Sequence, residues 1–289
     1  MLKTRIVGVL IVKGGIVVQS INFRRYLPVG IPGIAVEYLN NWGIDEIVLL
    51  DIDATPERRR PRYDKIIEYS KYCHVPFAVG GGITDTSDIE RLIRSGADKV
   101  VINTAAVNDP SLITQGARLF GNQCIVVSID VRRIKSGRYE VFTHSGTEPT
   151  GYSPRDFAKI VEQHGAGEIL LTSIDRDGCK QGYDLDMVKQ VVNAVNIPII
   201  VCGGVGEPKH FCEAMDLNVS AVAAGNFFHY TEHSVIVAKN FVKSAGFDVR
   251  LDTYTTYEDF KFDEGGRASK VDDPILDKLR FEYIPEEVI

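Results

Sequence analysis

Asp130 is the residue whose position points most directly to proton-transfer chemistry. It follows a run of six apolar or small residues, 124–129, so its side chain should stand at the end of a buried strand. Burial disfavours the charged form of a carboxyl group and raises its pKa, which suits a general acid or base. The alternative is a structural carboxylate that caps the amides of the next loop. Asp51 and Asp177 also follow predicted strands, and the sequence leaves open whether they bind ligand hydroxyls or hold loops.

Two glycine pairs, about 120 residues apart, predict phosphate binding. Each pair follows a β-branched strand, and small or polar residues follow the next strand. Backbone amides and a helix N-terminus can then close on a phosphate, although glycines can also serve only to allow tight turns. Two such segments facing each other favour a long ligand with a phosphate at each end. The candidate binding residues are Gly81, Gly82, Asn103 and Thr104 in one segment, and Thr172, Asp177, Gly203, Gly204, Gly225 and Asn226 in the other.

Four charged residues stand at the starts of predicted strands, at the end opposite to Asp130: Arg5, Glu46, Lys99 and Glu168. Charges of both signs at the end of a barrel are costly to bury unless they are paired, so these four should form a ring. Such a ring could serve stability alone. The six histidines show no zinc-ligand spacing, so we expect no metal and no cofactor.

An internal repeat indicates which elements position these residues. The segment 75–83 is echoed by 197–205, and the equivalent of Asp130 in the other half is Ile11. Short β-branched runs alternate with amphipathic stretches, which predicts an α/β fold, a (β/α)8 TIM barrel made of two half-barrels. The predicted strands are 5–11, 46–51, 76–80, 98–102, 124–130, 168–172, 198–201 and 220–224, and the predicted helices are 32–42, 58–72, 86–95, 110–120, 153–164, 184–194, 207–217 and 232–244.

Residues 1–247 are assigned to the barrel and residues 248–289 to a C-terminal strap. The strap is polar and acidic with interspersed aromatic residues, and we favour docking on the chain's own barrel over binding of a partner. Within the barrel, the alternating pattern of residues 132–150 predicts a hairpin above the mouth, where it could cover a substrate.

The overall composition is that of an ordinary globular protein, with 289 residues of which 44% are hydrophobic and 25% charged. The net charge of −6 gives no broad basic surface, so nucleic acid is not an expected partner. No segment approaches the roughly 20 apolar residues of a membrane span, so a membrane is not expected either. The five cysteines lack CxxC spacing, which favours reduced thiols and a cytoplasmic location.

The strand motifs resemble the cyclase subunit of imidazole glycerol phosphate synthase over about residues 1 to 250. In that family the barrel receives ammonia from a glutaminase subunit docked at its N-terminal face. The ammonia passes a gate of four charged residues, which matches Arg5, Glu46, Lys99 and Glu168. The resemblance rests on the strings Ala78–Ile83, Gly96–Val100, Ile102–Val107, Gln123–Val127, Gly165–Ser173 and Asp175–Gly178.

The resemblance therefore implies a glutaminase partner, an ammonia channel and a phosphorylated small-molecule ligand. It also implies that the family's phosphate anchors lie at Gly82, Asn103, Thr104 and Gly204, with Gly225 and Asn226 as altered members.

The sequence departs from the family at the first strand. The family has a catalytic aspartate, then Val-Lys-Asp-Gly, then a lysine in a mobile loop; this chain has Ile11, then Val-Lys-Gly-Gly, then Gln19. One of two catalytic carboxylates is thus absent, and Asp130 is the one retained. Loss of a general acid or base typically slows a reaction by about 10²- to 10⁴-fold.

Three hypotheses follow. The leading one, by resemblance, is a diverged family member that serves acetamidino-sugar formation for surface polysaccharides, together with a glutaminase and a separate sugar amidotransferase. The alternative is a genuine lyase-type cyclase subunit of histidine biosynthesis, in which Asp130 acts with Lys13 or a water in place of the lost aspartate. The third is a non-catalytic scaffold that activates the glutaminase.

Overall fold

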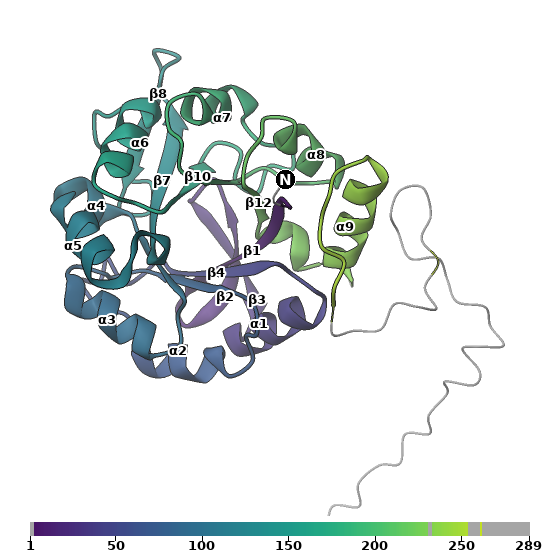
Figure 1. The fold of residues 1–289 in the computed structure, drawn as a ribbon, viewed down its shortest axis with the longest axis horizontal. Coiled ribbons are helices and arrows are strands. Elements are labelled where there is room, and N and C mark those ends of the chain that lie inside the picture. The colour runs from purple at the N-terminus through teal and green to yellow at the C-terminus, as the bar shows by residue number, and fades with distance from the viewer. Residues whose placement is uncertain (1–2, 231–232, 254–260, 262–289) are drawn as a thin grey trace, which may run out of the picture.

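The computed structural model describes residues 3–230, 233–253 and 261. Eight parallel strands form a closed ring with helices outside it, which confirms the predicted TIM barrel (Figure 1). The ring closes because β12 pairs with β1 and β10 pairs with β7. Its strands are β1 (Arg5–Lys13), β4 (Glu46–Asp51), β5 (Phe77–Gly80), β6 (Lys99–Ile102), β7 (Ile125–Arg133), β10 (Glu168–Ser173), β11 (Ile199–Cys202) and β12 (Ala221–Ala224).

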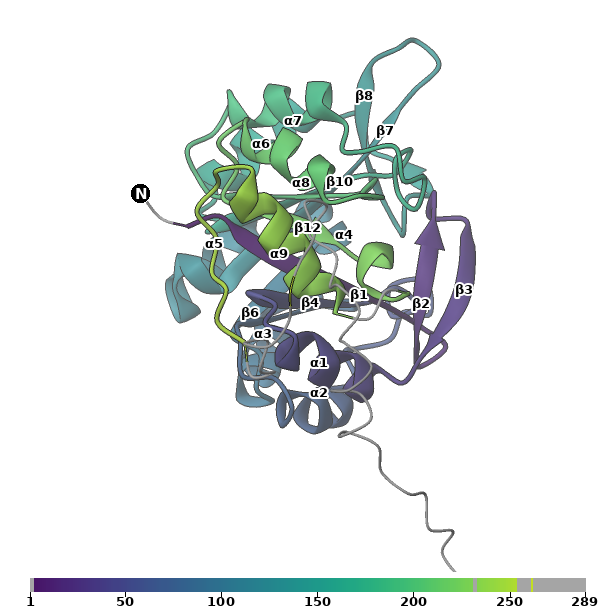
Figure 2. The ribbon, with the colours of Figure 1, turned by 90° about the vertical axis from the view of Figure 1, so that its right-hand side faces the viewer.

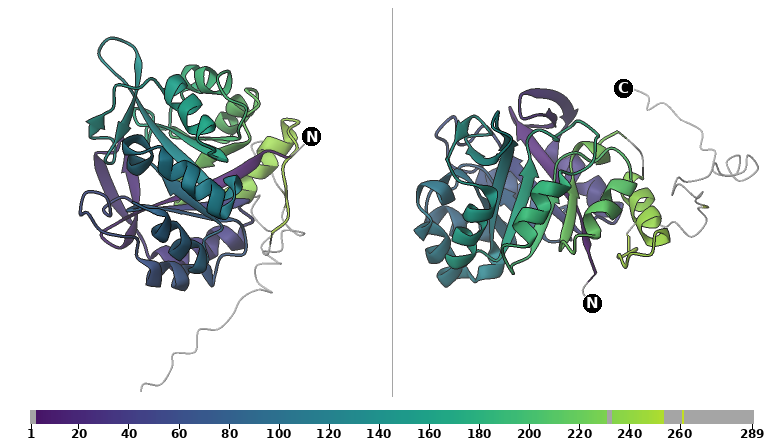
Figure 3. Two further views of the ribbon diagram at one scale, coloured as in Figure 1. Left: turned by 60° about the vertical axis from the view of Figure 1, so that its left-hand side comes forward. Right: turned by 90° about the horizontal axis from the view of Figure 1, so that it is seen from above.

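The helices cover the outer side of the strands (Figure 3). Several begin where the sequence supplies a cap: the Asp85 carboxylate accepts hydrogen bonds from the amides of Ser87 and Asp88 at the start of α3, and Ser153 caps α6 ahead of Pro154. The helices are α1 (Pro32–Asn41), α2 (Tyr63–Ser70), α3 (Thr86–Arg94), α4 (Thr104–Asn108), α5 (Ser111–Phe120), α6 (Pro154–Gln163), α7 (Leu185–Val192), α8 (Lys209–Met215) and α9 (Ser234–Ser244), with 3₁₀ turns at Asn122–Cys124 and Asn226–Phe228.

Alternation along each strand divides the core into two layers. In β1, Ile6 and Leu10 belong to the larger apolar cluster between strands and helices, whereas Val7 and Val9 belong to the cluster inside the barrel. The inner cluster consists mostly of valine and alanine, because eight strands leave room only for compact side chains inside. The barrel interior is therefore a narrow apolar column between the two ends.

Two antiparallel hairpins extend the barrel beyond the ends of its strands. One is formed by β1, β2 (Ile16–Ile21) and β3 (Arg25–Gly30), and the other by β7, β8 (Tyr139–Thr143) and β9 (Glu148–Pro149). Figure 2 shows β2, β3 and the loop after β7 on the side opposite to the start of β1.

The second hairpin confirms the prediction for residues 132–150, but the sequence analysis assigned no strand to residues 16–30 and missed α4. The chain turns from β1 into β2 at Gly14 and Gly15, whose φ values of 59° and 81° favour glycine.

The first part of the predicted strap lies against the barrel. The hydroxyl of Thr253 donates a hydrogen bond of 2.7 Å to the carbonyl of Asn41 at the end of α1, and Lys3 forms an ion pair with Asp248. The rest of the strap, apart from residue 261, lies outside the described residues, so its docking stays a prediction. Across the described ranges, no helix is both long and apolar enough to span a bilayer.

Candidate active site and the charged ring at the opposite end

A pocket opens at the C-terminal ends of the strands, where active sites of this fold lie. Both hairpins contribute to it, through residues such as Ser20, Tyr26 and Ser145. Most of the residues proposed from the sequence meet here. Those lining the pocket are Asp51, Gly81, Gly82, Asn103, Thr104, Asp130, Thr172, Asp177, Gly225 and Asn226.

Asp130 lies at the point where β7 leaves the barrel ring. Its two carboxylate oxygens accept hydrogen bonds from the Ser128 hydroxyl at 3.1 Å and from the Asn103 side-chain amide at 3.3 Å. Burial raises the pKa of Asp130 to about 7, the Ser128 hydrogen bond opposes this, and the charge of Asp177 adds to it. The carboxyl can thus give or take a proton near neutral pH, as the sequence predicts.

Asp177 is a second carboxyl group in the same pocket. It accepts a hydrogen bond of 2.5 Å from the Ser20 hydroxyl and one of 3.4 Å from the Phe23 amide. Burial raises the pKa of Asp177 to about 6, although these two hydrogen bonds oppose the shift. Two neighbouring carboxyls that titrate near neutrality can divide the roles of acid and base.

Ile11 lines the pocket from β1, so an apolar side chain occupies the position of the absent carboxylate. Lys13, considered as a replacement, does not line the pocket: its ammonium binds Asp53 at 2.8 Å and is about half exposed. Gln19 also lies outside the pocket lining and accepts a hydrogen bond from the Tyr230 hydroxyl. Asp51 also lines the pocket, but both of its carboxylate oxygens accept hydrogen bonds from the Arg59 guanidinium at 3.0–3.1 Å. Asp177, whose carboxylate accepts hydrogen bonds from neutral donors among the described residues, is therefore the better candidate for a second acid beside Asp130.

The two glycine pairs make equivalent close backbone approaches. A Cβ on Gly81 would lie 2.2 Å from the carbonyl oxygen of Asp51, and one on Gly203 would lie 2.7 Å from that of Ser173. All four glycines have positive φ. These contacts are what tight turns require, whether or not a phosphate binds. Gly81 and Gly82 line the pocket and Gly203 and Gly204 do not, so the binding role of the latter pair stays a prediction.

The polar residues after the neighbouring strands hold the two hairpins. The Thr104 hydroxyl accepts a hydrogen bond from the backbone amide of His144, beyond β8. The Asn226 side-chain amide donates to the carbonyl of Ser20 at 2.7 Å, and its oxygen accepts from the amide of Ser20 at 3.2 Å. The Asn226 side chain is therefore bound to the backbone of β2. To bind a ligand as predicted, it would have to do so while it keeps these hydrogen bonds or after it breaks them.

Sequence analysis missed several polar pocket residues, which include Ser20, Tyr26, Thr55, Ser128, Ser145 and His229. Ser128 had a signal, because it precedes Asp130 by two positions and so shares its face of the strand. Burial raises the pKa of Tyr26 to about 12, with Asp177 adding to the shift, and lowers the pKa of His229 to about 4. His229 is therefore neutral near pH 7.

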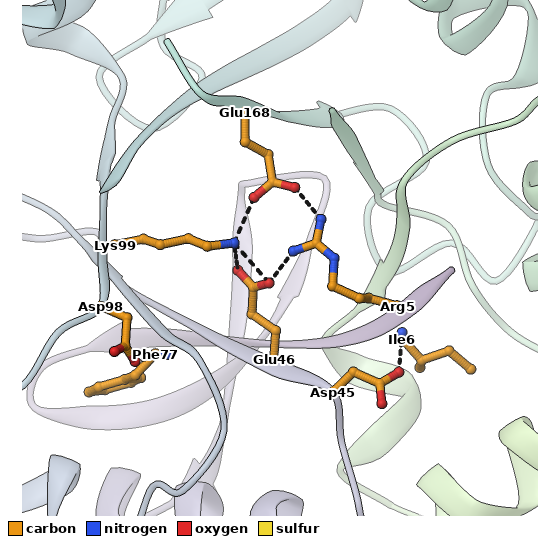
Figure 4. Close-up of polar contacts among 8 residues, drawn as sticks. All are labelled: Arg5, Ile6, Asp45, Glu46, Phe77, Asp98, Lys99 and Glu168. Carbon is orange, nitrogen blue, oxygen red and sulfur yellow. Dashed lines mark hydrogen bonds and ion pairs between the residues drawn. The ribbon is translucent and has the colours of Figure 1, made fainter. Parts of the chain in front are cut away.

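At the opposite end, the four charged residues form the ring predicted from the sequence (Figure 4). The Arg5 guanidinium bridges Glu46 and Glu168, and the Lys99 ammonium contacts the same two carboxylates at 2.8–3.0 Å. Burial alone would raise the pKa of Glu168, but Arg5 and Lys99 hold it below its usual range. Each charge in the ring has two partners of opposite sign.

The aspartates before two ring strands reinforce this end. Asp45 accepts a hydrogen bond of 2.7 Å from the amide of Ile6, and Asp98 accepts one of 2.8 Å from the amide of Phe77 (Figure 4). The second oxygen of Asp45 pairs with the buried ammonium of Lys239 on α9 at 2.6 Å. In the described part of the chain, no cluster of three or more His, Cys, Asp and Glu side chains could hold a metal ion.

Comparison with known proteins identifies close relatives. Residues 5–234 match the family described as histidine biosynthesis protein. The chain is 42% identical over 269 residues to a putative imidazole glycerol phosphate synthase subunit hisF2 of Vibrio vulnificus strain YJ016, covering 92% of this chain and 98% of the relative. It is 46% identical over 253 residues to the imidazole glycerol phosphate synthase subunit HisF of Pyrococcus furiosus, covering 87% of this chain and all of the relative.

Proposed function

The chain belongs to the histidine biosynthesis protein family, and from that premise we propose that it is the ammonia-using barrel subunit of a glutamine-dependent synthase of the imidazole glycerol phosphate synthase type. One observation carries the proposal: a saturated charged ring and a pocket with a titratable carboxyl lie at opposite ends of one apolar barrel interior. That arrangement suits entry of a small molecule at one end and its use at the other.

A glutaminase subunit would dock at the N-terminal face and deliver ammonia to the ring. Neutral ammonia can cross an apolar interior, whereas an ammonium ion would lose its hydration without a counter-charge. The inner cluster, which includes Val48, Ala78 and Ala221, supplies the apolar interior. For ammonia to pass the ring, one pair such as Lys99 and Glu46 must open transiently, and Lys99 is the simpler group to move because it has a flexible four-carbon stem.

We favour a phosphorylated substrate of the kind that the HisF relatives convert, with ring closure as the reaction. The names of both relatives support this choice, as does the second carboxyl at Asp177. Asp130 would transfer a proton at the atom that ammonia attacks, and Asp177 would take the complementary role. Gly82, Asn103 and Thr104 would bind one phosphate, and Gly225 with Asn226 the other.

Ile11 favours a second candidate, in which the acceptor has diverged to an acetamido sugar that a separate amidotransferase converts to its acetamidino form. An apolar residue at a catalytic position is difficult to reconcile with full cyclase turnover. The comparisons support the cyclase-type function better than this one.

An ammonia-transfer assay with the purified chain, a glutaminase subunit and glutamine separates the candidates. One arm offers the phosphoribulosyl formimino substrate of the histidine pathway and the other an acetamido sugar with its amidotransferase. Turnover in the first arm at ordinary enzyme rates, about 1 s⁻¹ or more, supports the cyclase function. Product in the second arm alone rejects it.

Two variants complete the design. Ile11→Asp should raise turnover of the histidine-pathway substrate if the missing carboxylate limits it. Asp130→Asn tests the scaffold hypothesis, because a chain that only activates the glutaminase would tolerate this change without loss of product.

A further inference from the structure

A second hollow lies on the other side of the β2–β3 turn from the barrel pocket. Ser20, Phe23 and Tyr26 line the barrel pocket, whereas their neighbours in the turn face the second hollow. The turn is therefore a shared wall between the two. The second hollow is lined by Ile21, Asn22, Arg24, Arg25, Arg132 and Asp175.

The charges around this hollow do not balance. Three arginines and one aspartate are among the lining residues, which gives a formal net charge of three minus one, or +2. Asp175 is already committed, because one oxygen accepts a hydrogen bond of 2.7 Å from the Arg133 amide. Its other oxygen lies 3.9 Å from Nε of Arg132, beyond hydrogen-bond range. Across the described ranges, no carboxylate lies within 4.0 Å of the Arg24 or Arg25 guanidinium.

Arg132 is the most constrained of the three. Its guanidinium lies 4.7 Å from the centre of the Phe142 ring on β8, in a cation–π contact. Burial lowers the pKa of Arg132, the nearby charge of Arg24 lowers it further, and the charge of Asp175 opposes the shift in part. Positive charges held close together repel one another unless an anion binds between them. In the ring at the other end of the barrel, by contrast, every charge already has partners of opposite sign.

The wall that carries Arg24 and Arg25 is anchored. Asn22 adopts a left-handed conformation with φ of 53°, and its side-chain amide donates a hydrogen bond of 2.9 Å to the carbonyl of Asp175. The backbone amide of Asn22 also donates a hydrogen bond of 3.0 Å to the backbone carbonyl of Asp177. The turn is thereby pinned to the loop after β10, which holds the guanidinium groups near one another before any ligand arrives.

We propose that Arg24, Arg25 and Arg132 form an anion site outside the barrel pocket, which binds a phosphate or diphosphate group. Guanidinium groups bind phosphate oxygens through paired hydrogen bonds, and a charge of +2 matches a phosphate dianion. This site goes beyond the proposed function, because the phosphate positions of that function lie inside the barrel pocket. The phosphate can be a free anion or part of a larger ligand, such as a nucleotide sugar.

Arginine-selective labelling of the full chain with phenylglyoxal, followed by peptide mapping, tests the site locally. The probes are inorganic phosphate, pyrophosphate and a uridine diphosphate sugar. We expect saturating pyrophosphate to slow labelling of Arg24 and Arg25 about fivefold or more, because guanidinium groups held by phosphate are shielded from the reagent. Arg118 and Arg155, which are exposed on α5 and α6, serve as internal controls and should label at an unchanged rate.

The double variant R24Q/R25Q provides the second measurement, with R118Q/R155Q as a control that removes the same charge elsewhere. In calorimetric titrations with pyrophosphate, R24Q/R25Q should weaken binding at this site about tenfold or more, and the control less than about twofold.

Protection by the nucleotide sugar alone would mean that the phosphate arrives on a larger ligand, and protection by all three probes would mean that the free anion binds. Equal labelling rates with and without every probe would overturn the proposal. That result would leave the proposed enzymatic function untouched, since the ammonia-transfer assay measures the barrel pocket.

Discussion

The two ends of the barrel treat buried charge in opposite ways. At the N-terminal end, Glu46 and Glu168 each contact both Arg5 and Lys99, and all four charges are satisfied. At the C-terminal end, the donors that the Asp130 carboxylate meets within the described part of the chain are neutral, and its pKa is raised. The strands that connect the two ends are the same, so the difference comes from which residue types the sequence puts at strand starts and strand ends.

This contrast separates groups that hold the barrel from groups that can do chemistry. A carboxylate between two cations stays ionised and cannot exchange a proton near neutral pH. A buried carboxyl without a cation titrates in that range. The comparison therefore predicts large effects on activity at one end and large effects on stability at the other.

The largest effect expected is on turnover at the mouth. Asp130→Asn keeps the shape of the side chain but removes its proton chemistry, so product formation with a glutaminase and glutamine should fall about 10²- to 10⁴-fold. Asp64→Asn, an exposed change on α2, is the matched control and should leave the rate unchanged. An Asp130→Asn rate within tenfold of the parent would remove Asp130 from the mechanism.

The ring should show the largest effect on stability. Glu46 is fully buried, and Glu46→Ala leaves Arg5 and Lys99 with one carboxylate between them. Breaking a buried ion pair by removing one partner typically costs about 3–5 kcal/mol, which denaturant unfolding would measure. Glu90→Ala, which removes an exposed helix pair with Arg94, should cost only about 0.3–0.5 kcal/mol. Similar losses for the two variants would mean that the ring does not hold the barrel.

The pH dependence of stability sharpens the same comparison. The folded pKa of Asp130 is about 7 and its ordinary value is 3.8, so folding favours the protonated form. Its contribution to stability is full below pH 3.8 and is lost as the pH rises through about 7. Relative to Asp130→Asn, the parent should lose on the order of 2–4 kcal/mol over that window in denaturant titrations at several pH values. A constant difference between the two proteins would show that the Asp130 pKa is not raised.

The smallest effect concerns Lys13, which the sequence analysis considered as a substitute catalyst. Its ion pair with Asp53 is about half exposed and lies outside the pocket lining. Lys13→Ala should therefore change stability by less than about 1 kcal/mol and turnover by less than twofold, in the same two assays. A large loss of turnover in Lys13→Ala would contradict this expectation and would mean that the Lys13 ammonium takes part in the reaction.

Much of the fold was predictable from the sequence because strand and helix patterns are local. All eight barrel strands and the helices other than α4 were assigned, and the repeat at residues 75–83 and 197–205 indicated the two halves. Strands β2 and β3 were missed, because Gly14 and Gly15 are the one glycine signal for the β1–β2 turn, and the β2–β3 turn uses positive φ at the non-glycine residues Asn22 and Phe23.

The candidate site was predictable to the extent that its residues follow strands. Asp130, Asn103 and Gly82 were identified in this way, and all line the pocket. Ser20 and Tyr26 were missed because they come from the unrecognised hairpin. Gly203 and Gly204 were placed correctly at a strand end, but local sequence gives no indication that they are not among the residues that line the pocket.

By itself, the sequence determined the barrel, the family and the four charges at the strand starts, because each depends on the order of residues along single strands. Only the tertiary structure decided which charges are neutralised. The pairing of Arg5 with Glu168, and the lack of a cation beside Asp130 among the described residues, depend on distances between residues far apart in the chain. The same distances decided that Arg24, Arg25 and Arg132 share a hollow in which Asp175 is the one carboxylate among the lining residues, because two separate hairpins bring the arginines together.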